Sequence, residues 1–183
     1  MMNKGDLIVM PTDTVYGLAA RLYDEEALKK IYEIKGREQS KQIPLLISNL
    51  DQIKDIAIFD EHVKKIMDQF WPGALTIVME TTPQFKQKTG EDTIAIRMPK
   101  HPKALELIEL NGILRVTSLN KSGESPLDDI DDIKKQFGTY VSHIYPQGDV
   151  LKSHVSSTVM QFKNHEIKIL REGTITLEDL MQV

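Results

Sequence analysis

Short apolar runs of strand length alternate with amphipathic helical segments along most of this chain, and this alternation constrains its fold more than any other feature. Strands are predicted at residues 7–10, 44–48, 74–80, 93–98, 113–117, 140–144, 157–162 and 167–170. Helices are predicted at residues 24–36, 60–70, 101–112 and 129–137, with shorter ones after Asp51 and Thr176. Such alternation predicts an α/β fold, and the successive strands near the end predict an open, twisted mixed sheet flanked by helices.

Residues at the helix ends and between the elements support these assignments. Asp24 and Asp60 are predicted N-caps, Gly36 can end the first helix, and Thr176 with Asp179 resembles a capping box. Polar stretches at residues 38–42 and 118–126 are predicted to be loops, and residues 81–92 an exposed connection. A turn is predicted at residues 164–165.

The length of 183 residues fits one domain covering residues 1–183, because neither a repeat nor a linker interrupts the pattern. Cysteine is absent, which excludes disulfides, thiolate metal sites and a cysteine nucleophile. The first residues enter a strand without a signal-peptide pattern, and no apolar stretch approaches the roughly 20 residues that span a bilayer. We therefore expect a cytoplasmic protein without a membrane partner. Its net charge of −4 argues against strong direct binding of nucleic acid.

The stretch Leu-Ile-Val-Met-Pro-Thr-Asp-Thr-Val-Tyr-Gly-Leu, residues 7–18, changes abruptly from apolar to polar. Pro11 cannot donate to a sheet ladder and suits the end of a strand. Thr12, Asp13, Thr14 and Tyr16 follow at once, and polar side chains at a strand end often line a ligand crevice. An ordinary polar turn explains this stretch equally well.

Three other polar clusters lie near element ends. Lys35 and Arg37 could aim at one oxyanion, although cations at the end of a helix are also common as solvated caps. Arg97 lies in an apolar strand, where a guanidinium needs a partner such as Asp13 or a ligand carboxylate. The loop at residues 118–123 offers hydroxyls, an amide and backbone N–H groups that suit a phosphate or nucleotide.

Several common catalytic motifs are missing from the sequence. It contains no Walker loop, no Rossmann fingerprint and no Gly-x-Ser-x-Gly elbow, and its five histidines do not have zinc spacing. No protein-bound metal site is therefore predicted. Spacing alone supports an anion-binding crevice and no particular reaction.

Seven motifs in a fixed order resemble the YrdC-like family, and together they cover nearly the whole chain. They are Pro-Thr-Asp-Thr-Val-Tyr-Gly-Leu (11–18), Lys-Gly-Arg (35–37), Phe-Trp-Pro-Gly-Ala-Leu-Thr (70–76), Ile-Arg-Met-Pro-Lys-His-Pro (96–102), Thr-Ser-Leu-Asn-Lys-Ser-Gly (117–123), Ser-Thr-Val (157–159) and Ile-Leu-Arg-Glu-Gly (169–173). The chain resembles the short, single-domain form of the family.

The resemblance implies an open, twisted sheet with a deep, positively lined cavity. It also implies a nucleotidyltransferase, threonylcarbamoyl-AMP synthase. This enzyme forms threonylcarbamoyl-adenylate and pyrophosphate from L-threonine, bicarbonate and ATP. The product serves a downstream threonylcarbamoyl transferase that makes N6-threonylcarbamoyladenosine in tRNA, so tRNA is only an indirect partner.

The resemblance also implies roles for individual residues. It assigns catalytic charge neutralisation and ATP binding to Lys35 and Arg37, and further ATP contacts to Ser118, Asn120 and Arg171. It assigns threonine binding to Thr12, Arg97 and Ser157. No protein nucleophile is needed, because positioning and charge neutralisation supply most of the catalysis. Mg²⁺ is expected with ATP and would be held mainly by phosphates and water.

The chain departs from the family pattern at three places. Glu38 follows the Lys-x-Arg signature where many members have proline, and Leu119 replaces a small residue. A segment with a single glycine, residues 147–155, replaces a glycine-rich approach to Ser-Thr-Val. These changes leave a non-catalytic, RNA-binding relative as the alternative, although the acidic net charge disfavours it. A third hypothesis is a carbamoyl-adenylate chemistry like that of hydrogenase maturation domains. Such domains usually belong to a larger multidomain chain.

Overall fold

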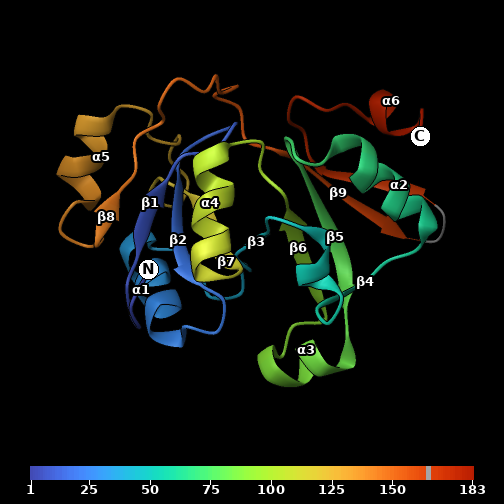
Figure 1. Cartoon of the computed structure of the whole chain (residues 1–183), viewed down its shortest axis with the longest axis horizontal. Coiled ribbons are helices and arrows are strands. Elements are labelled where there is room, and N and C mark those ends of the chain that lie inside the picture. Colours follow the sequence, from blue (N-terminus) through green and yellow to red (C-terminus); the bar gives the residue numbers. More distant parts are fainter. Residues whose placement is uncertain (164–165) are drawn as a thin grey trace.

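The computed structural model describes residues 1–163 and 166–183, and in this part of the chain one ten-stranded sheet carries helices on both faces (Figure 1). Its strands are β1 (Ile8–Met10), β2 (Gly17–Arg21), β3 (Leu45–Leu46), β4 (Ala57–Ile58), β5 (Leu75–Thr81), β6 (Thr93–Arg97), β7 (Leu114–Ser118), β8 (His143–Ile144), β9 (Thr158–Lys163) and β10 (Glu166–Arg171). Its helices are α1 (Glu25–Lys35), the 3₁₀ helix η1 (Leu50–Ile53), α2 (Glu61–Phe70), α3 (Pro83–Thr89), α4 (Pro102–Asn111), α5 (Ile130–Phe137) and α6 (Leu177–Leu180).

The sheet is mixed, as the sequence predicts. Its order is β10-β9-β5-β6-β3-β7-β2-β1-β8, with β4 added beside β5. The pairs β5/β9, β3/β6 and β1/β8 are parallel, and all the other pairs are antiparallel. The two-residue strand β3 lies at the centre and joins the half that holds β5, β6, β9 and β10 to the half that holds β1, β2 and β7 (Figure 1).

Local capping explains where several helices begin and end. Asp24 accepts a hydrogen bond from the Ala27 N–H at 3.0 Å, and Gly36 ends α1 in the left-handed conformation with φ of 58°. Asp60 caps α2 in the same way, and the predicted capping box of Thr176 and Asp179 is present at α6. The predicted helix ends therefore follow from side chains within one turn.

The prediction of an exposed connection at residues 81–92 is wrong, because this segment contains α3. The Thr82 hydroxyl accepts from the Phe85 N–H at 3.2 Å, Pro83 occupies the first turn, and Gly90 ends the helix with φ of 75°. Burial of Phe85 attaches this short helix to the core. The strands β2 and β4 were not predicted, and the turn predicted at residues 164–165 lies outside the described residues.

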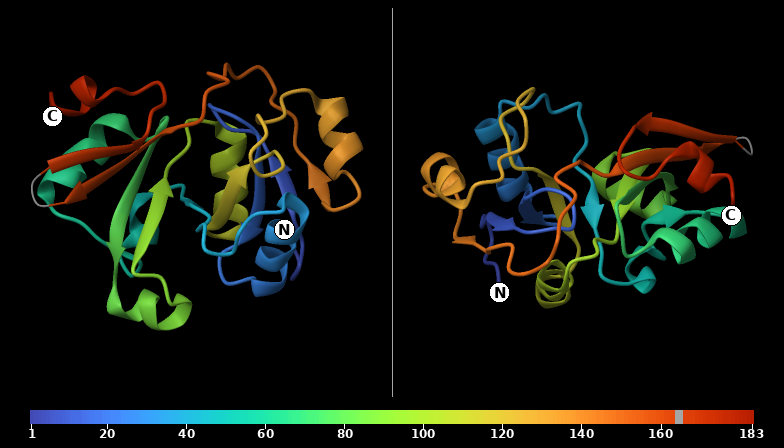
Figure 2. Two further views of the ribbon diagram at one scale, coloured as in Figure 1. Left: turned by 180° about the vertical axis from the view of Figure 1, so that it is seen from behind. Right: turned by 90° about the horizontal axis from the view of Figure 1, so that it is seen from above.

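Strand alternation sends side chains to two separately covered faces. Val9 and Leu18 pack in the cluster under α1 and α5, whereas Ile8 and Met10 pack in the cluster under α4. A third cluster fills the space between the β5/β6 region, α2 and α3. Helices lie on both faces of the sheet (Figure 2), and β1 is accordingly apolar at every position.

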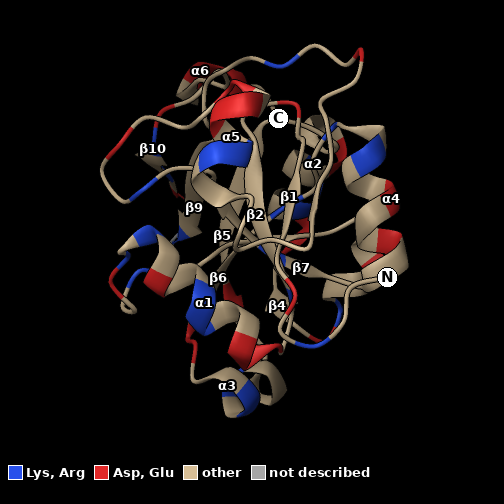
Figure 3. Ribbon diagram, turned by 90° about the vertical axis from the view of Figure 1, so that its left-hand side faces the viewer, with Lys and Arg blue, Asp and Glu red and all other residues tan. Residues whose placement is uncertain are grey.

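The outer helix surfaces carry both signs of charge. Pairs three or four residues apart join Lys30 with Glu26, Lys103 with Glu106 and Lys134 with Asp131, on α1, α4 and α5 respectively (Figure 3). Across the described ranges 1–163 and 166–183, no helix is both long enough and apolar enough to cross a bilayer.

Candidate functional site

The polar motif that follows β1 is the loop of a β-hairpin. β1 and β2 pair antiparallel with Met10 opposite Gly17, so residues 11–16 form the connection between them. A Cβ at Gly17 would lie 2.4 Å from the Val116 side chain, and only glycine fits this crowded strand start. The hairpin therefore holds Thr12, Asp13 and Thr14 at one edge of the sheet.

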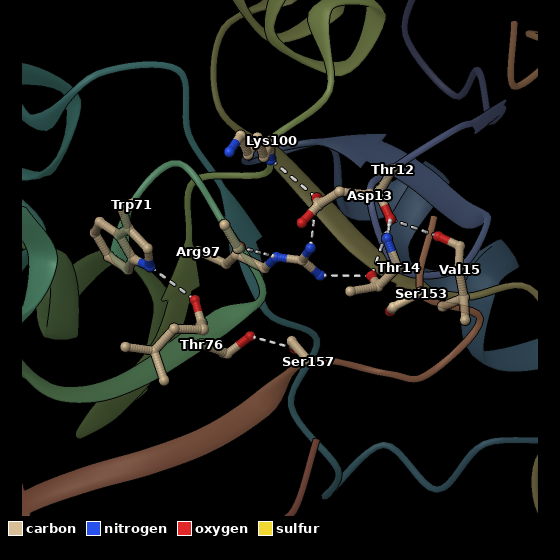
Figure 4. A network of polar contacts seen from close by, with 12 residues as sticks. Thr12, Asp13, Thr14, Val15, Trp71, Thr76, Arg97, Lys100, Ser153 and Ser157 are labelled. Carbon is tan, nitrogen blue, oxygen red and sulfur yellow. Dashed lines mark hydrogen bonds and ion pairs between the residues drawn. The ribbon is translucent and has the colours of Figure 1, made fainter. Parts of the chain in front are cut away.

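Arg97 connects this hairpin loop to the end of β6. Its Nε donates to the Gly73 carbonyl at 2.8 Å, NH1 to the Thr14 hydroxyl at 2.8 Å, and NH2 to the Asp13 carboxylate at 2.6 Å (Figure 4). Asp13 also accepts from the Lys100 backbone N–H at 2.9 Å. Burial lowers the pKa of Arg97 while Asp13 raises it, and an arginine remains protonated at neutral pH. Within residues 1–163 and 166–183, two of its five N–H groups have no partner and can donate to another acceptor.

The Thr12 hydroxyl is already saturated within the loop. It donates to the Val15 carbonyl at 2.7 Å, accepts from the Thr14 N–H at 3.1 Å and lies 3.0 Å from the Thr14 hydroxyl. A hydroxyl offers one donor and two acceptor positions, so all three are occupied. In this conformation Thr12 shapes the loop around Thr14 and has no free hydrogen-bonding position for a ligand.

A second group of polar side chains comes from β5 and the C-terminal strands. The Thr76 and Ser157 hydroxyls lie 2.7 Å apart, and both residues are buried. Arg171 donates to the Ser157 carbonyl from Nε at 3.0 Å and from NH2 at 2.8 Å, and to the Ser157 hydroxyl at 3.1 Å. Its NH1 has no partner in the described part of the chain and remains available.

Lys35 and Arg37 do not converge on one point. The Lys35 ammonium is buried and donates to the Ser118 and Asn120 carbonyls. Arg37 turns the other way, donating from Nε to the Lys41 carbonyl at 3.0 Å and from NH2 to the Gln42 carbonyl at 2.9 Å. The common oxyanion target that the spacing suggested is therefore absent in this conformation.

These groups surround a cavity of about 170 Å³ in which no described lining residue is acidic. Its cations are three arginines, and its hydroxyls come from several segments that are distant in sequence: Arg37, Arg97, Arg171, Thr12, Thr14, Thr76, Thr117, Ser118, Ser156 and Ser157. Cationic side chains and hydroxyl groups favour an anionic ligand, although the charge of Arg97 is already compensated by Asp13. Six of the eight predicted site residues line the cavity. Lys35 and Asn120 do not.

Among the polar contributors to the cavity that the sequence analysis did not single out are Thr76, Gln42 and Thr117. Thr76 alternates with apolar neighbours in β5, so its burial beside Ser157 depends on the parallel pairing of β5 with β9. Gln42 lies in a stretch predicted to be a polar loop, and nothing in its local sequence marks it as a contributor to the cavity.

The connection from β8 to β9 runs across the hairpin loop on its way between the two halves of the sheet (Figure 2). The Gln147 N–H donates to the Tyr16 hydroxyl at 2.9 Å, and its side-chain amide donates to the Thr12 carbonyl at 3.1 Å. Further along, the Ser153 N–H donates to the Asp13 carbonyl at 3.0 Å. Burial raises the pKa of Tyr16, so it remains a neutral phenol at this wall of the cavity.

Comparison with known proteins assigns this arrangement to a family. A family model labelled Sua5_yciO_yrdC and described as "Telomere recombination" matches residues 1–173. The threonylcarbamoyl-AMP synthase of Bacillus subtilis is 33% identical over 188 residues, covering 100% of this chain and 54% of that protein. A Mycobacterium tuberculosis relative, to which the same activity is provisionally assigned, is 31% identical, covering 100% of this chain and 85% of its own length.

A solved structure extends the match to three dimensions. The crystal structure of Pyrococcus abyssi Sua5 complexed with L-threonine superposes with a TM-score of 0.88 at 34% identity, covering 97% of this chain and 53% of that one. Fold, motif order and sequence identity agree along the whole chain, and on these grounds the protein belongs to the Sua5/YciO/YrdC family.

Proposed function

We propose that this protein is a threonylcarbamoyl-AMP synthase, a nucleotidyltransferase that consumes L-threonine, bicarbonate and ATP. The main support is the acid-free cavity lined by Arg37, Arg97 and Arg171, in a chain that matches named synthases over its full length. ATP and bicarbonate are anions and L-threonine carries a carboxylate, and guanidinium groups suit all three. Nothing in the comparisons favours the non-catalytic RNA-binding alternative. A cytoplasmic location stays a prediction.

In the proposed reaction, the threonine amine attacks the carboxyl carbon of bicarbonate, and water leaves as the carbamate forms. A carbamate oxygen then attacks the α-phosphorus of ATP, and the bond to the β-phosphate breaks to release pyrophosphate. The chain supplies position and positive charge for these steps. Arg37 and Arg171 would face the phosphates, and the two unused N–H groups of Arg97 would hold the threonine carboxylate.

Mg²⁺ fits this proposal as an ion that enters the site bound to the phosphates of ATP. The described residues contain no cluster of three His, Asp or Glu side chains that could hold it, and the cavity lining contains no carboxylate. Phosphate and water oxygens are its usual ligands at such sites. We propose a structural role for Asp13, because its Oδ1 accepts from both Arg97 and the Lys100 N–H and so joins the hairpin loop to the end of β6.

The cavity is smaller than the roughly 300–1,000 Å³ typical of ligand sites, at about 170 Å³. ATP and threonine together therefore need it to widen. The β8–β9 connection is the segment we propose to move, and it is attached to the hairpin loop by two hydrogen bonds from Gln147 and one from Ser153. Such closing segments commonly exclude water from a reaction.

Pyrophosphate release tests the proposal. Purified protein with ATP, Mg²⁺ and bicarbonate should release pyrophosphate only when L-threonine is present. Arg171→Met should lower kcat/KM on the order of 10²-fold, because it removes a cation from the lining. Lys29→Met on the outer face of α1 is the matched control and should leave the rate unchanged, because Lys29 forms an exposed ion pair with Glu33 at 3.8 Å. Threonine-independent release, or full activity of Arg171→Met, would refute the assignment.

A further inference from the structure

The β8–β9 connection begins with a firmly bonded residue and continues with a loosely packed segment. Gln147 is bonded to the hairpin loop, and its carbonyl lies 3.0 Å from Nε2 of the buried His101. Segment 148–156 follows, which the structure describes in full, and none of its residues is buried. Its apolar side chains Leu151 and Val155 are exposed and belong to none of the hydrophobic clusters. Polar contacts therefore hold this segment in place.

Lys152 makes the strongest of these polar contacts. Its side chain is only 10% exposed, and its ammonium donates to the Asp128 carboxylate. The same ammonium lies 4.6 Å from the centre of the Tyr16 ring, which is a cation–π contact. Because Tyr16 lines the cavity, Lys152 joins segment 148–156 to the cavity wall. Burial lowers the pKa of Lys152, and the Asp128 carboxylate supplies the compensating charge.

Asp128 offers these contacts from a fixed position. Its Oδ1 accepts from Lys152, and its Oδ2 lies 2.7 Å from Nδ1 of His154, so segment 148–156 contacts both carboxylate oxygens. On one side of Asp128, Leu127 packs against the cluster under α1 and α5. On the other side, Asp129 is the N-cap of α5. The ion pair therefore attaches a loosely packed segment to a firmly packed one.

This closed arrangement is a conformation of the ligand-free protein. Segment 148–156 ends at Ser156 in the lining of a cavity of about 170 Å³, which is too small for ATP and threonine together. To move away from the hairpin loop, the segment has to withdraw Lys152 from both Tyr16 and Asp128. Substrate entry and these two contacts therefore compete.

We infer that Lys152 is a latch, which holds segment 148–156 over the cavity through Asp128 and Tyr16 and is released when substrates enter. The identity of those substrates rests on the proposed function, whereas the closing contact does not. A site that is open for only a fraction of the time has its apparent affinity reduced by that fraction, so the latch would set the substrate concentration that the protein needs. Lys152 lies within residues 147–155, where this chain lacks the glycine-rich pattern of its family.

Hydrogen exchange of the ligand-free protein measures the opening of segment 148–156. Lys152→Met removes the charge but keeps an unbranched side chain, and it should speed exchange in this segment about three- to tenfold. Asp128→Asn should act in the same direction, and Lys152→Arg, which keeps the charge, should retain the wild-type rate. Lys134→Met is the matched control, because it removes an exposed ion pair with Asp131 at 3.2 Å on α5, and it should leave the rate unchanged.

Salt separates the charge of the latch from the shape of its side chain. At 1 M NaCl the screening length falls to about 3 Å, which weakens an ion pair that is partly open to solvent. Exchange in segment 148–156 should therefore become faster with salt in wild type and should hardly change in Lys152→Met. The fluorescence of Trp71, the single tryptophan, verifies that each variant is folded.

Steady-state kinetics tests the consequence for substrate entry. Lys152→Met should lower the KM for ATP by about the factor by which it speeds exchange, with kcat unchanged, because the latch is released in the substrate complex. Unchanged exchange in both Lys152→Met and Asp128→Asn would show that this pair does not close the segment. Faster exchange with an unchanged KM would refute its control of entry, and a raised KM would show instead that Lys152 contacts a substrate. If wild-type protein releases no pyrophosphate, the proposed function fails, whereas the exchange experiment still decides whether Lys152 closes the segment.

Discussion

Replacing Asp13 with alanine should destabilise the protein strongly, because Asp13 is the carboxylate that compensates the charge of Arg97. The side chains are 7% exposed for Arg97 and 13% for Asp13, with NH2 and Oδ1 2.6 Å apart. Removing one partner from a buried ion pair typically costs about 3–5 kcal/mol, since the remaining charge stays desolvated. The Lys100 backbone N–H would also lose its acceptor. We expect a loss in this range for Asp13→Ala.

Urea unfolding followed by the fluorescence of Trp71 measures this loss. Trp71 is buried and donates from its indole nitrogen to the Leu75 carbonyl at 2.7 Å, close to the Gly73 carbonyl that Arg97 uses. For a urea m-value of about 2 kcal/mol/M, the midpoint should fall by roughly 2 M. The control is Glu38→Ala, whose exposed carboxylate lies 3.7 Å from Lys41 and should contribute less than about 0.5 kcal/mol.

The double variant Asp13→Ala/Arg97→Met measures the interaction energy between the two side chains separately from the contribution of each residue alone. Once the guanidinium is absent, loss of Asp13 leaves no uncompensated charge, so the double variant should lose clearly less than the sum of the two single variants. The reasoning is refuted if Asp13→Ala costs less than about 1 kcal/mol, or if the two changes are additive.

Three further predictions follow from single positions. Gly173→Ala should cost several kcal/mol in urea unfolding, because the new Cβ would lie within 2.7 Å of backbone atoms of residues 156–158; a stability close to wild type would contradict this. Burial and a neighbouring guanidinium lower the pKa of Lys35 to about 8 in the folded protein. Between that value and the unfolded pKa near 10.5 the unfolded state binds more protons, so the free energy of unfolding should rise with pH in wild type but not in Lys35→Met. Tyr16→Phe leaves the Gln147 N–H without its acceptor and should cost about 1–2 kcal/mol and speed proteolysis of the β8–β9 connection; equal cleavage rates would argue against this attachment.

The sequence predicted the elements whose signals are local. Caps at Asp24 and Asp60 and the box at Thr176 act within one helical turn, so they are readable from neighbouring residues. β2 was missed because Gly17–Arg21 contains glycine and two alanines, which do not favour a strand, and its pairing with β1 and β7 determines its conformation.

The sequence predicted which residues lie near the cavity better than it predicted the hydrogen bonds among them. Arg97 was expected to need a partner, and Asp13 was one of the two alternatives, because a buried guanidinium is costly in any fold. The separation of Lys35 from Arg37 could not be predicted, since it depends on where the 118–120 carbonyls lie relative to the end of α1. That position comes from the packing of Leu119, which is distant from α1 in sequence.

The strand order also affects how the protein is made. The cavity wall uses residues from Thr12 near the start of the chain to Arg171 near its end, and β9 must reach β5 before Ser157 and Thr76 meet. At about 5–20 residues per second, a ribosome needs roughly 10–30 s to add this interval. A ligand stabilises only the conformation that binds it, so no substrate can assist the nascent chain during that time. The chain must complete its sheet without help from the molecules it binds.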